Sequence, residues 1–184
     1  MSKLARKPIV IPKGVKVEFE NNTVKLTGVK GVIEKLIPEP IKLIITSENI
    51  KVDMADKEET NTSLQGTITA LLKNMLKGVA EGFKKDLELV GVGYKAELKN
   101  RELILNIGYT KPVVMNVPQG LNINIEKQTK ISVAGVDKQL LGLWCAKVKS
   151  VRPPDAYKGK GIKFADEVLK LKPGKTAATA EAKT

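Results

Sequence analysis

Histidine is absent from the 184-residue chain, and cysteine occurs only once, at Cys145. The lack of histidine removes the commonest general base and the commonest metal ligand. A single cysteine excludes an intrachain disulfide and any zinc site that needs several cysteines. We therefore expect no catalytic residues, no metal site and no cofactor, and an enzyme is the least favoured class of protein.

Long apolar runs are also lacking. No stretch of about 18 apolar residues is present, so the sequence predicts no membrane-spanning helix. The first residues, Met1 to Pro8, are rich in lysine and arginine and contain no apolar segment typical of a secretory signal. A cytoplasmic location is the resulting expectation.

Aromatic residues make up 4% of the chain against 42% apolar residues, which predicts a mainly aliphatic core. Lysine and arginine number 32 against 20 acidic residues, a net charge of +12. The excess lies at the two ends: residues 1–13 hold four cations and no acid, and residues 138–175 hold ten cations and three acids. Residues 14–137 are nearly neutral, with 17 cations and 16 acids. This distribution indicates a polyanionic partner such as a nucleic acid.

A sequence pattern occurs twice. Residues 7–19 and residues 111–125 both read Lys-Pro, an apolar run, Pro-x-Gly and then alternating apolar residues. Each is followed by a second alternating run, at residues 23–29 and 130–136. Alternation predicts half-buried strands, and Pro-x-Gly predicts a turn between them. We interpret the pattern as an internal repeat in which residues 7–19 correspond to residues 111–125.

Two helices are expected from apolar residues at helical spacing. The first spans residues 64–80, and the second spans residues 138–150 with Asp137 as its N-cap. Together with the strands, they predict an α+β fold of two similar tandem domains, each an antiparallel sheet packed against one main helix. The expected domains are residues 1–82 and 83–175, followed by a flexible tail at 176–184.

Two further pairs of strands are expected. In the first domain, residues 41–46 and 49–53 form one pair. In the second, residues 86–98 and 101–109 form a hairpin that closes at Asn100. A glycine pattern in this hairpin, Gly91-Val92-Gly93-Tyr94-Lys95-Ala96, fits the dinucleotide-binding fingerprint on paper. Because alternating residues follow it, we interpret the glycines as a bulge or a close backbone approach within a strand.

Trp144 and Cys145 lie on the apolar face of the second expected helix. The simplest interpretation places both in the core, with an inert thiol, because no histidine is present to activate the cysteine.

The segment that follows the second helix, residues 152–164, is here called the strap. Pro153 and Pro154 cannot continue a helix, and Gly159 and Gly161 allow unusual backbone angles. Its charged and aromatic residues are Arg152, Asp155, Tyr157, Lys158, Lys160, Lys163 and Phe164. Two interpretations are open from these residues: an RNA-binding segment in which lysines meet phosphates and rings stack on bases, or a solvated basic loop.

The strap closely resembles the signature of ribosomal protein six of the large subunit in its bacterial form, the universal uL6 family. Residues 87–96 and 135–139 also resemble that family. The resemblance implies a two-domain α+β protein whose second domain binds large-subunit, 23S-type ribosomal RNA and so supports translation. It implies a place near the sarcin–ricin region and the base of the factor-binding stalk. The implied partners are this RNA, neighbouring ribosomal proteins and, nearby, translation factors.

The resemblance implies a set of RNA contacts within the strap: Arg152, Tyr157, Lys158, Gly159, Lys160, Gly161 and Lys163. Charge alone adds four lysines outside it: Lys147, Lys149, Lys170 and Lys172. Two departures from the family pattern are visible. Ala5-Arg6-Lys7 stands where the family tends to have Arg-Ile-Gly-Lys, and Asp155-Ala156 stands where Glu-Pro is usual.

Two other classes of function remain as alternatives. A free RNA-binding regulator outside the ribosome would need base-reading arginines or a recognisable reader motif, and neither is present. An enzyme acting on an anionic substrate would need a convergent acid–base pair, which the sequence does not indicate. The expectation is therefore a non-enzymatic structural component of the large ribosomal subunit.

Overall fold

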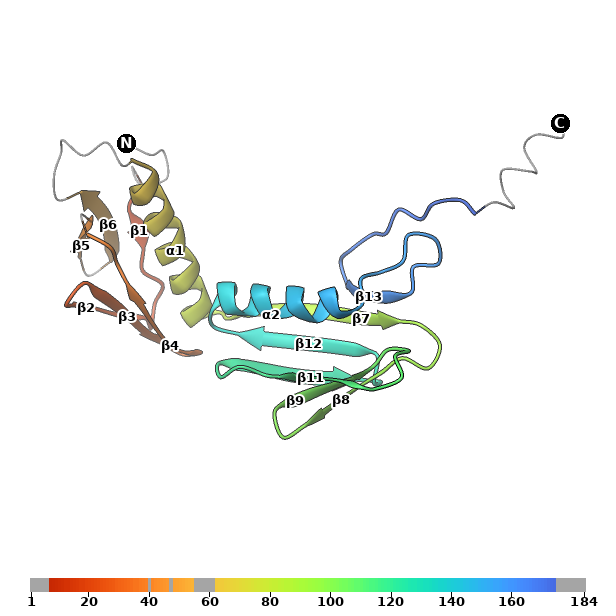
Figure 1. Ribbon diagram of the computed structural model, residues 1–184. Coiled ribbons are helices and arrows are strands. Elements are labelled where there is room, and N and C mark those ends of the chain that lie inside the picture. The colour runs from red at the N-terminus through yellow and green to blue at the C-terminus, as the bar shows by residue number, and fades with distance from the viewer. Residues whose placement is uncertain (1–6, 40, 47, 55–61, 175–184) are drawn as a thin grey trace, which may run out of the picture. The chain divides into compact units, whose positions relative to one another are not determined.

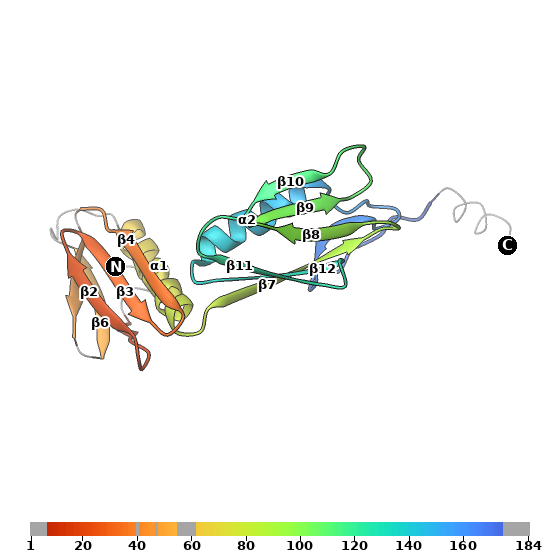
Figure 2. The ribbon, with the colours of Figure 1, turned by 90° about the horizontal axis from the view of Figure 1, so that it is seen from below.

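The computed structural model describes residues 7–39, 41–46, 48–54 and 62–174, and within these ranges the chain has an α+β fold (Figures 1 and 2). The chain forms two compact units. The first ends at Phe83 and also takes in residues 135–138, and the second begins at Lys84. Among the described residues, each unit contains two antiparallel sheets and one helix, where the sequence predicted one sheet and one helix.

The first unit is built from six strands and a helix: β1 (Ile9–Val10), β2 (Lys16–Glu20), β3 (Thr23–Gly28), β4 (Gly31–Leu36), β5 (Ile41–Ile45), β6 (Asn49–Met54) and α1 (Thr62–Ala80). One sheet has the order β2-β3-β4 and the other has the order β1-β6-β5. The strands expected at 41–46 and 49–53 are β5 and β6, and the helix expected at 64–80 is α1. Strand β4 is an addition to the expected elements.

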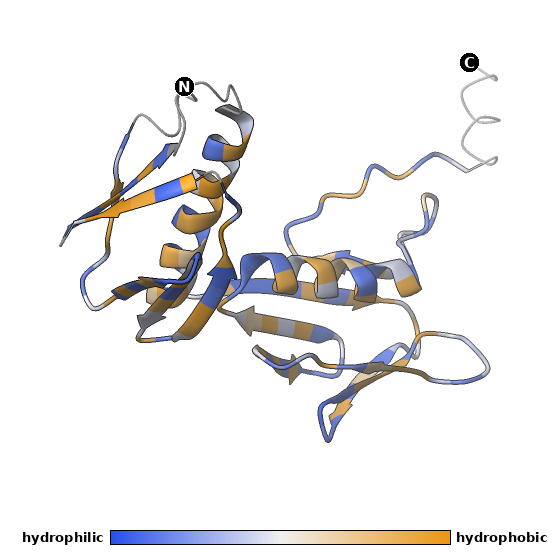
Figure 3. Cartoon of the chain, turned by 60° about the vertical axis from the view of Figure 1, so that its left-hand side comes forward, coloured by the Kyte–Doolittle hydropathy of each residue, from blue (hydrophilic) through white to orange (hydrophobic). Residues whose placement is uncertain are grey.

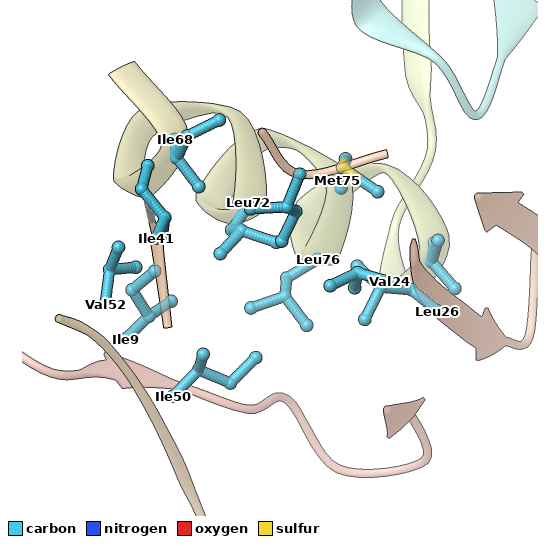
Figure 4. Close-up of a cluster of buried hydrophobic side chains, with 12 residues drawn as sticks. Ile9, Val24, Leu26, Ile41, Ile50, Val52, Ile68, Leu72, Met75 and Leu76 are labelled. Carbon is cyan, nitrogen blue, oxygen red and sulfur yellow. The ribbon is translucent and has the colours of Figure 1, made fainter. Parts of the chain in front are cut away.

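The core of the first unit lies between α1 and its two sheets (Figure 4). Along the helix, the buried apolar side chains recur at helical spacing: Ile68, Leu72, Met75, Leu76 and Val79. The sheets meet them with Val24 and Leu26 from β3, and with Ile50 and Val52 from β6. Figure 3 shows the hydrophobic and hydrophilic residues alternating along these elements, which is why one face of each is buried.

The second unit is built from seven strands and a helix: β7 (Phe83–Val90), β8 (Lys95–Lys99), β9 (Glu102–Asn106), β10 (Val113–Asn116), β11 (Leu121–Glu126), β12 (Lys130–Gly135), α2 (Lys138–Val151) and β13 (Gly161–Phe164). One sheet has the order β10-β9-β8, and the other has the order β11-β12-β7-β13. The helix expected at residues 138–150 is α2. Leu141, Trp144, Cys145 and Val148 form its buried face.

The sheet orders confirm the internal repeat but change its register. Sheet β2-β3-β4 corresponds to β8-β9-β10, and β1-β6-β5 corresponds to β7-β12-β11, in the same order along the chain. The two equivalent hairpins turn through residues with positive φ, Asn21 and Asn22 in the first and Asn100 and Arg101 in the second. The predicted match of residues 7–19 with 111–125 is therefore wrong, and β13 is an addition to the second unit.

Similar proline turns explain why residues 7–19 resemble residues 111–125 in sequence without being their counterparts in the repeat. In the second unit, Leu121 N–H donates to the carbonyl of Pro118 as β11 begins. The equivalent turn in the first unit is the one in which Ile41 N–H donates to Pro38, before β5. Pro-x-Gly at residues 12–14 precedes a different strand, β2. The same turn chemistry is thus used at two non-equivalent places in the repeat.

The strand expected over residues 86–98 is interrupted. β7 ends at Val90, and Tyr94 N–H closes a turn on the carbonyl of Gly91 at 3.3 Å. Gly93 has a φ of 77°, which favours glycine, and β8 then runs in the other sheet. The dinucleotide-like pattern therefore leads into a strand and not into a helix. The hairpin of β8 and β9 closes at Asn100 and Arg101.

Within the described ranges, neither helix combines the length and apolar character needed to cross a membrane. Both helices instead place exposed lysines on the face away from the core, at Lys73 and Lys77 in α1 and at Lys147 in α2.

Replacement of Leu72 by alanine tests the core of the first unit. Leu72 is 2% exposed and lies in the centre of α1. Its truncation should lower the free energy of unfolding of this unit by about 2–5 kcal/mol, since a cavity remains. Amide hydrogen exchange in α1 should accelerate accordingly. Val29→Ala is the control, because Val29 is 82% exposed. Equal exchange rates in the two variants would contradict this view of the core.

Candidate nucleic-acid interface

The strap leaves α2 and returns to the protein as an edge strand. α2 ends at Val151, just before the two prolines. The carbonyl of Arg152 accepts a hydrogen bond from Ile162 N–H at 2.9 Å. β13 then pairs antiparallel with β7, from Gly161 opposite Val90 to Phe164 opposite Leu87. Both ends of the strap are therefore fixed to the second unit.

A tight turn around Asp155 forms the middle of the strap. Asp155 N–H donates to the carbonyl of Lys160 at 2.9 Å, and Gly159 N–H donates to the carbonyl of Asp155 at 3.0 Å. The Asp155 carboxylate also accepts the N–H of Lys158 at 3.0 Å. The side chains of Lys158 and Lys160 are exposed on this turn. The turn thus holds two ammonium groups on a backbone that already has its own hydrogen bonds.

The two strap glycines are favoured for different reasons, Gly161 by a close approach and Gly159 by its positive φ. Gly161 has a φ of 147°, and a Cβ on it would lie 2.6 Å from the carbonyl oxygen of Pro153 and from Cα of Pro154. Gly159 has a φ of 68°, and its Cβ position faces Leu169 and Leu171 at 3.7 and 3.5 Å. Any side chain at Gly161 would push β13 away from the two prolines.

Residues 165–174 follow β13 and are here called the extension. The N–H of Lys172 donates to the carbonyl of Ala156 at 2.8 Å, so the extension runs back along the turn of the strap. Figure 1 shows the two segments side by side in blue beyond β13. Lys170 and Lys172 are exposed on it. The extension therefore adds two cations to the same region as Lys158 and Lys160.

Arg152 is directed into the second unit. Its Nη1 donates to the carbonyl of Ile107 at 2.6 Å, and the guanidinium lies 5.5 Å from the ring centre of Tyr94 and 5.1 Å from that of Tyr109. The hydroxyl of Tyr109 donates to the carbonyl of Val151 at 3.0 Å. These contacts secure the start of the strap. The sequence contained no signal that would associate these two tyrosines with Arg152.

Lys149 and Lys163 are paired with carboxylates of the same unit. Lys149 Nζ lies 2.7 Å from both oxygens of Glu167, and it also lies over the ring of Phe164 at 5.1 Å. This hydrogen bond lowers the pKa of Glu167 from its ordinary value. Lys163 Nζ lies 3.6 Å from Glu88. These two lysines are half-buried and contribute first to holding β13 and the extension in place.

The remaining predicted cations point to solvent. Among the predicted site residues, five exposed lysines form no ion pair within the described part of the chain: Lys147, Lys158, Lys160, Lys170 and Lys172. Tyr157, in the same turn, is 59% exposed. The predicted site thus divides into residues that hold the strap in place, such as Arg152, and residues whose side chains are exposed to solvent and accessible to a ligand. Unpaired ammonium groups can neutralise phosphates, and the exposed ring beside them can stack on a base.

Trp144 and Cys145 lie inside the unit and not at this surface. The Trp144 indole N–H donates to the carbonyl of Asn116 at 3.2 Å. Cys145 is fully buried, and burial raises the pKa of its thiol from 9.0 to about 11. A thiol that stays protonated at neutral pH is a poor nucleophile, which agrees with the interpretation of both residues as core.

Comparison with known proteins connects this geometry to a family. The family model described as ribosomal protein L6 matches residues 11–82 and 90–165, one segment in each unit. Proteins named large ribosomal subunit protein uL6 from Synechocystis sp., Carboxydothermus hydrogenoformans and Moorella thermoacetica are 41, 43 and 43% identical to the chain. The alignments cover 96, 96 and 97% of this chain and 98, 97 and 97% of those proteins.

The two matched segments agree with the repeat that the sheets define. The first contains β2 to α1, and the second contains β8 to β13, with equivalent hairpins at the start of each. The family match therefore supports the strand-by-strand correspondence over the one inferred from the Lys-Pro pattern.

Gly161→Ala tests whether the strap depends on its approach to the prolines. The added methyl group should push β13 away from the proline pair and break the hydrogen bond from Ile162 N–H to the carbonyl of Arg152, because it would lie 2.6 Å from backbone atoms of that pair. We expect faster amide exchange at Ile162 and Phe164. Gly142→Ala is the control, since a Cβ there has open space around it. Unchanged exchange in Gly161→Ala would contradict the proposed packing.

Alkylation of Cys145 tests the burial of the core thiol. Iodoacetamide should label Cys145 very slowly at pH 8 in the folded protein and rapidly in denaturant, because burial holds the thiol protonated. The raised pKa also stabilises the fold fully below about pH 9, and this contribution is lost as the pH rises towards 11. Comparison with Cys145→Ala isolates this part of the pH dependence. Rapid labelling of the folded protein would contradict the assignment.

Proposed function

The chain belongs to the ribosomal protein L6 family, and on that premise we propose that it is a structural constituent of the large ribosomal subunit. The family is one of ribosomal structural proteins and not of enzymes. In this proposal, the domain of residues 83–175 binds 23S-type ribosomal RNA near the sarcin–ricin region and the base of the factor-binding stalk. The protein acts in the cytoplasm within the assembled subunit, beside other ribosomal proteins and close to bound translation factors.

The observation that carries the RNA-binding proposal is the turn of the strap with its unpaired lysines. Lys158 and Lys160 project from a turn that its own backbone and Asp155 already hold together. Lys170 and Lys172 are added by the extension, which is bonded to the same turn. Because the backbone that carries these groups is held before binding, contact with phosphates requires no ordering of the turn, and it releases counterions.

The character of the exposed cations favours recognition of backbone and shape. All five exposed, unpaired cations of the predicted site are lysines, whereas Arg152 is directed into the protein. Arginine is the residue that reads guanine edges through two parallel hydrogen bonds, and lysine acts as a point charge. The protein therefore binds a folded RNA surface, which suits a ribosomal component better than a free regulator.

A division of labour between the units follows. Residues 14–137 are nearly neutral, so most of the first unit lacks the charge that RNA binding requires. In the proposal, residues 1–82 contribute mainly protein contacts and scaffolding.

Replacement of Lys158 and Lys160 by alanine tests the proposed interface. Binding to large-subunit RNA should weaken, and the slope of log K against log salt should become shallower by about one to two units, as for the loss of two phosphate contacts. Lys95 and Lys111 are the matched controls, being exposed lysines of the same unit outside the strap. The double alanine variant of this pair should keep the slope. Equal slopes in both variants would contradict the interface.

Sedimentation tests the function itself. In moderate salt, the tagged protein should travel with the large subunit in a sucrose gradient of cell lysate. Recovery in the soluble fraction alone would contradict a structural ribosomal role and would favour the free regulator.

A further inference from the structure

The first unit carries an open groove between β1 and α1, with a volume of about 900 Å³. Its apolar surface comes from both elements, and lysines stand at its rim. Its lining includes Pro8, Ile9 and Val10 on one side and Lys73, Leu76 and Lys77 on the other. Figure 1 shows β1 alongside α1 at this position. A groove of this size is large enough to hold several side chains of another segment.

The internal repeat indicates what kind of segment fits such a groove. β1 is the edge of its sheet, and its counterpart β7 is flanked by β13 in the second unit. β13 buries Ile162 completely and lies against β7 on the side that is open in β1. The second unit therefore supplies from its own chain an extended segment that has no counterpart among the described residues of the first unit.

The two helices identify the contacts that such a segment makes. Aligned from their first residues, Thr62 and Lys138, the helices place their buried residues in register, and Lys73 then corresponds to Lys149. Lys149 lies over the ring of Phe164 and binds the carboxylate of Glu167, three residues further along. In the second unit, the segment of β13 and the residues after it thus places a ring, Phe164, and then a carboxylate, Glu167, against this helix position.

The charges at the rim of the first groove suit the same chemistry. Lys7 and Lys73 are exposed and have no ion pair within the described residues. Lys77 pairs weakly with Glu81, at 3.8 Å. The rim thus holds three cations and one acid, and two of the cations are available to an incoming carboxylate.

The backbone of β1 restricts how a segment can bind. Ile11 N–H donates to the carbonyl of Glu48, and Ile9 lies opposite Ile50. The backbone groups of an antiparallel ladder point alternately to the two sides of the strand, so those of Pro8, Val10 and Pro12 point to the open edge. The two prolines have no N–H, so Val10 is the one donor of these three residues. Unspecific strand pairing is disfavoured here, and selection depends on side chains.

We propose that this groove binds an extended segment of a neighbouring large-subunit protein. The segment carries an aromatic or large aliphatic side chain that enters the apolar part of the groove. A carboxylate about three residues later binds Lys73, as Glu167 binds Lys149 in the second unit. This inference rests on the proposed ribosomal function, because it takes the partner from the assembled subunit.

Photocrosslinking in assembled large subunits tests the inference. A benzophenone amino acid replaces Val10, which is 69% exposed and is one of the residues that line the groove. After irradiation of subunits purified from cells, mass spectrometry should identify one peptide of another ribosomal protein with the expected spacing of ring or aliphatic residue and acid. Lys73→Glu should lower the crosslink yield by about fivefold to tenfold, since an attractive contact becomes repulsive. Lys51→Glu is the matched control, an exposed lysine of the same unit outside the groove.

The outcomes separate this inference from the proposed function. If the labelled protein sediments with the large subunit but crosslinks to RNA, to its own residues 1–6 or to nothing, the inference is overturned and the function stands. Equal yields in the two lysine variants would also overturn it. If neither the labelled nor the unlabelled protein sediments with the subunit, the proposed function and the inference both fail.

Discussion

The pairing of β13 with β7 is the constraint on which the candidate interface depends. It fixes one end of the strap through a four-residue ladder, and the fully buried side chain of Ile162 anchors this end in the core. Arg152 fixes the other end between two tyrosine rings. With both ends held, the backbone of the turn between them has little freedom, so the points from which its lysine side chains project are set in the absence of a ligand. A basic loop without these anchors would have to be ordered at the moment of binding, at a cost in entropy.

The cations of the second unit serve two physical purposes. Lys149 and Lys163 are half-buried, and their pairing with Glu167 and Glu88 offsets the cost of removing charge from water. The exposed lysines contribute almost nothing to the stability of the free protein, because water and salt screen their charges. The same charges contribute much more to the free energy of binding to a phosphate backbone, where they displace counterions. The fold thus retains a positive surface without using it for its own stability.

Periodicity made the main elements predictable, because α1, α2 and the β8–β9 hairpin each repeat one pattern over many residues. β13 was not predictable in this way, since Gly161–Phe164 is too short to show alternation and begins with glycine. The register of the repeat was misread because similar proline turns precede non-equivalent strands. The composition of the strap indicated a basic surface. Which of its cations are internal depends on contacts with residues distant in sequence, such as Ile107 and Glu88, and these contacts leave no local pattern.

The unequal lengths of the two helices have an evolutionary consequence. α1 runs for 19 residues and α2 for 14, although both begin at the same place in the repeat. Where α1 continues, the second copy reaches Pro153 and leaves the helical path. After an ancestral duplication, one copy could thus acquire a nucleic-acid surface by ending a helix early and redirecting the released chain. Divergence of function within a single polypeptide then required no additional domain.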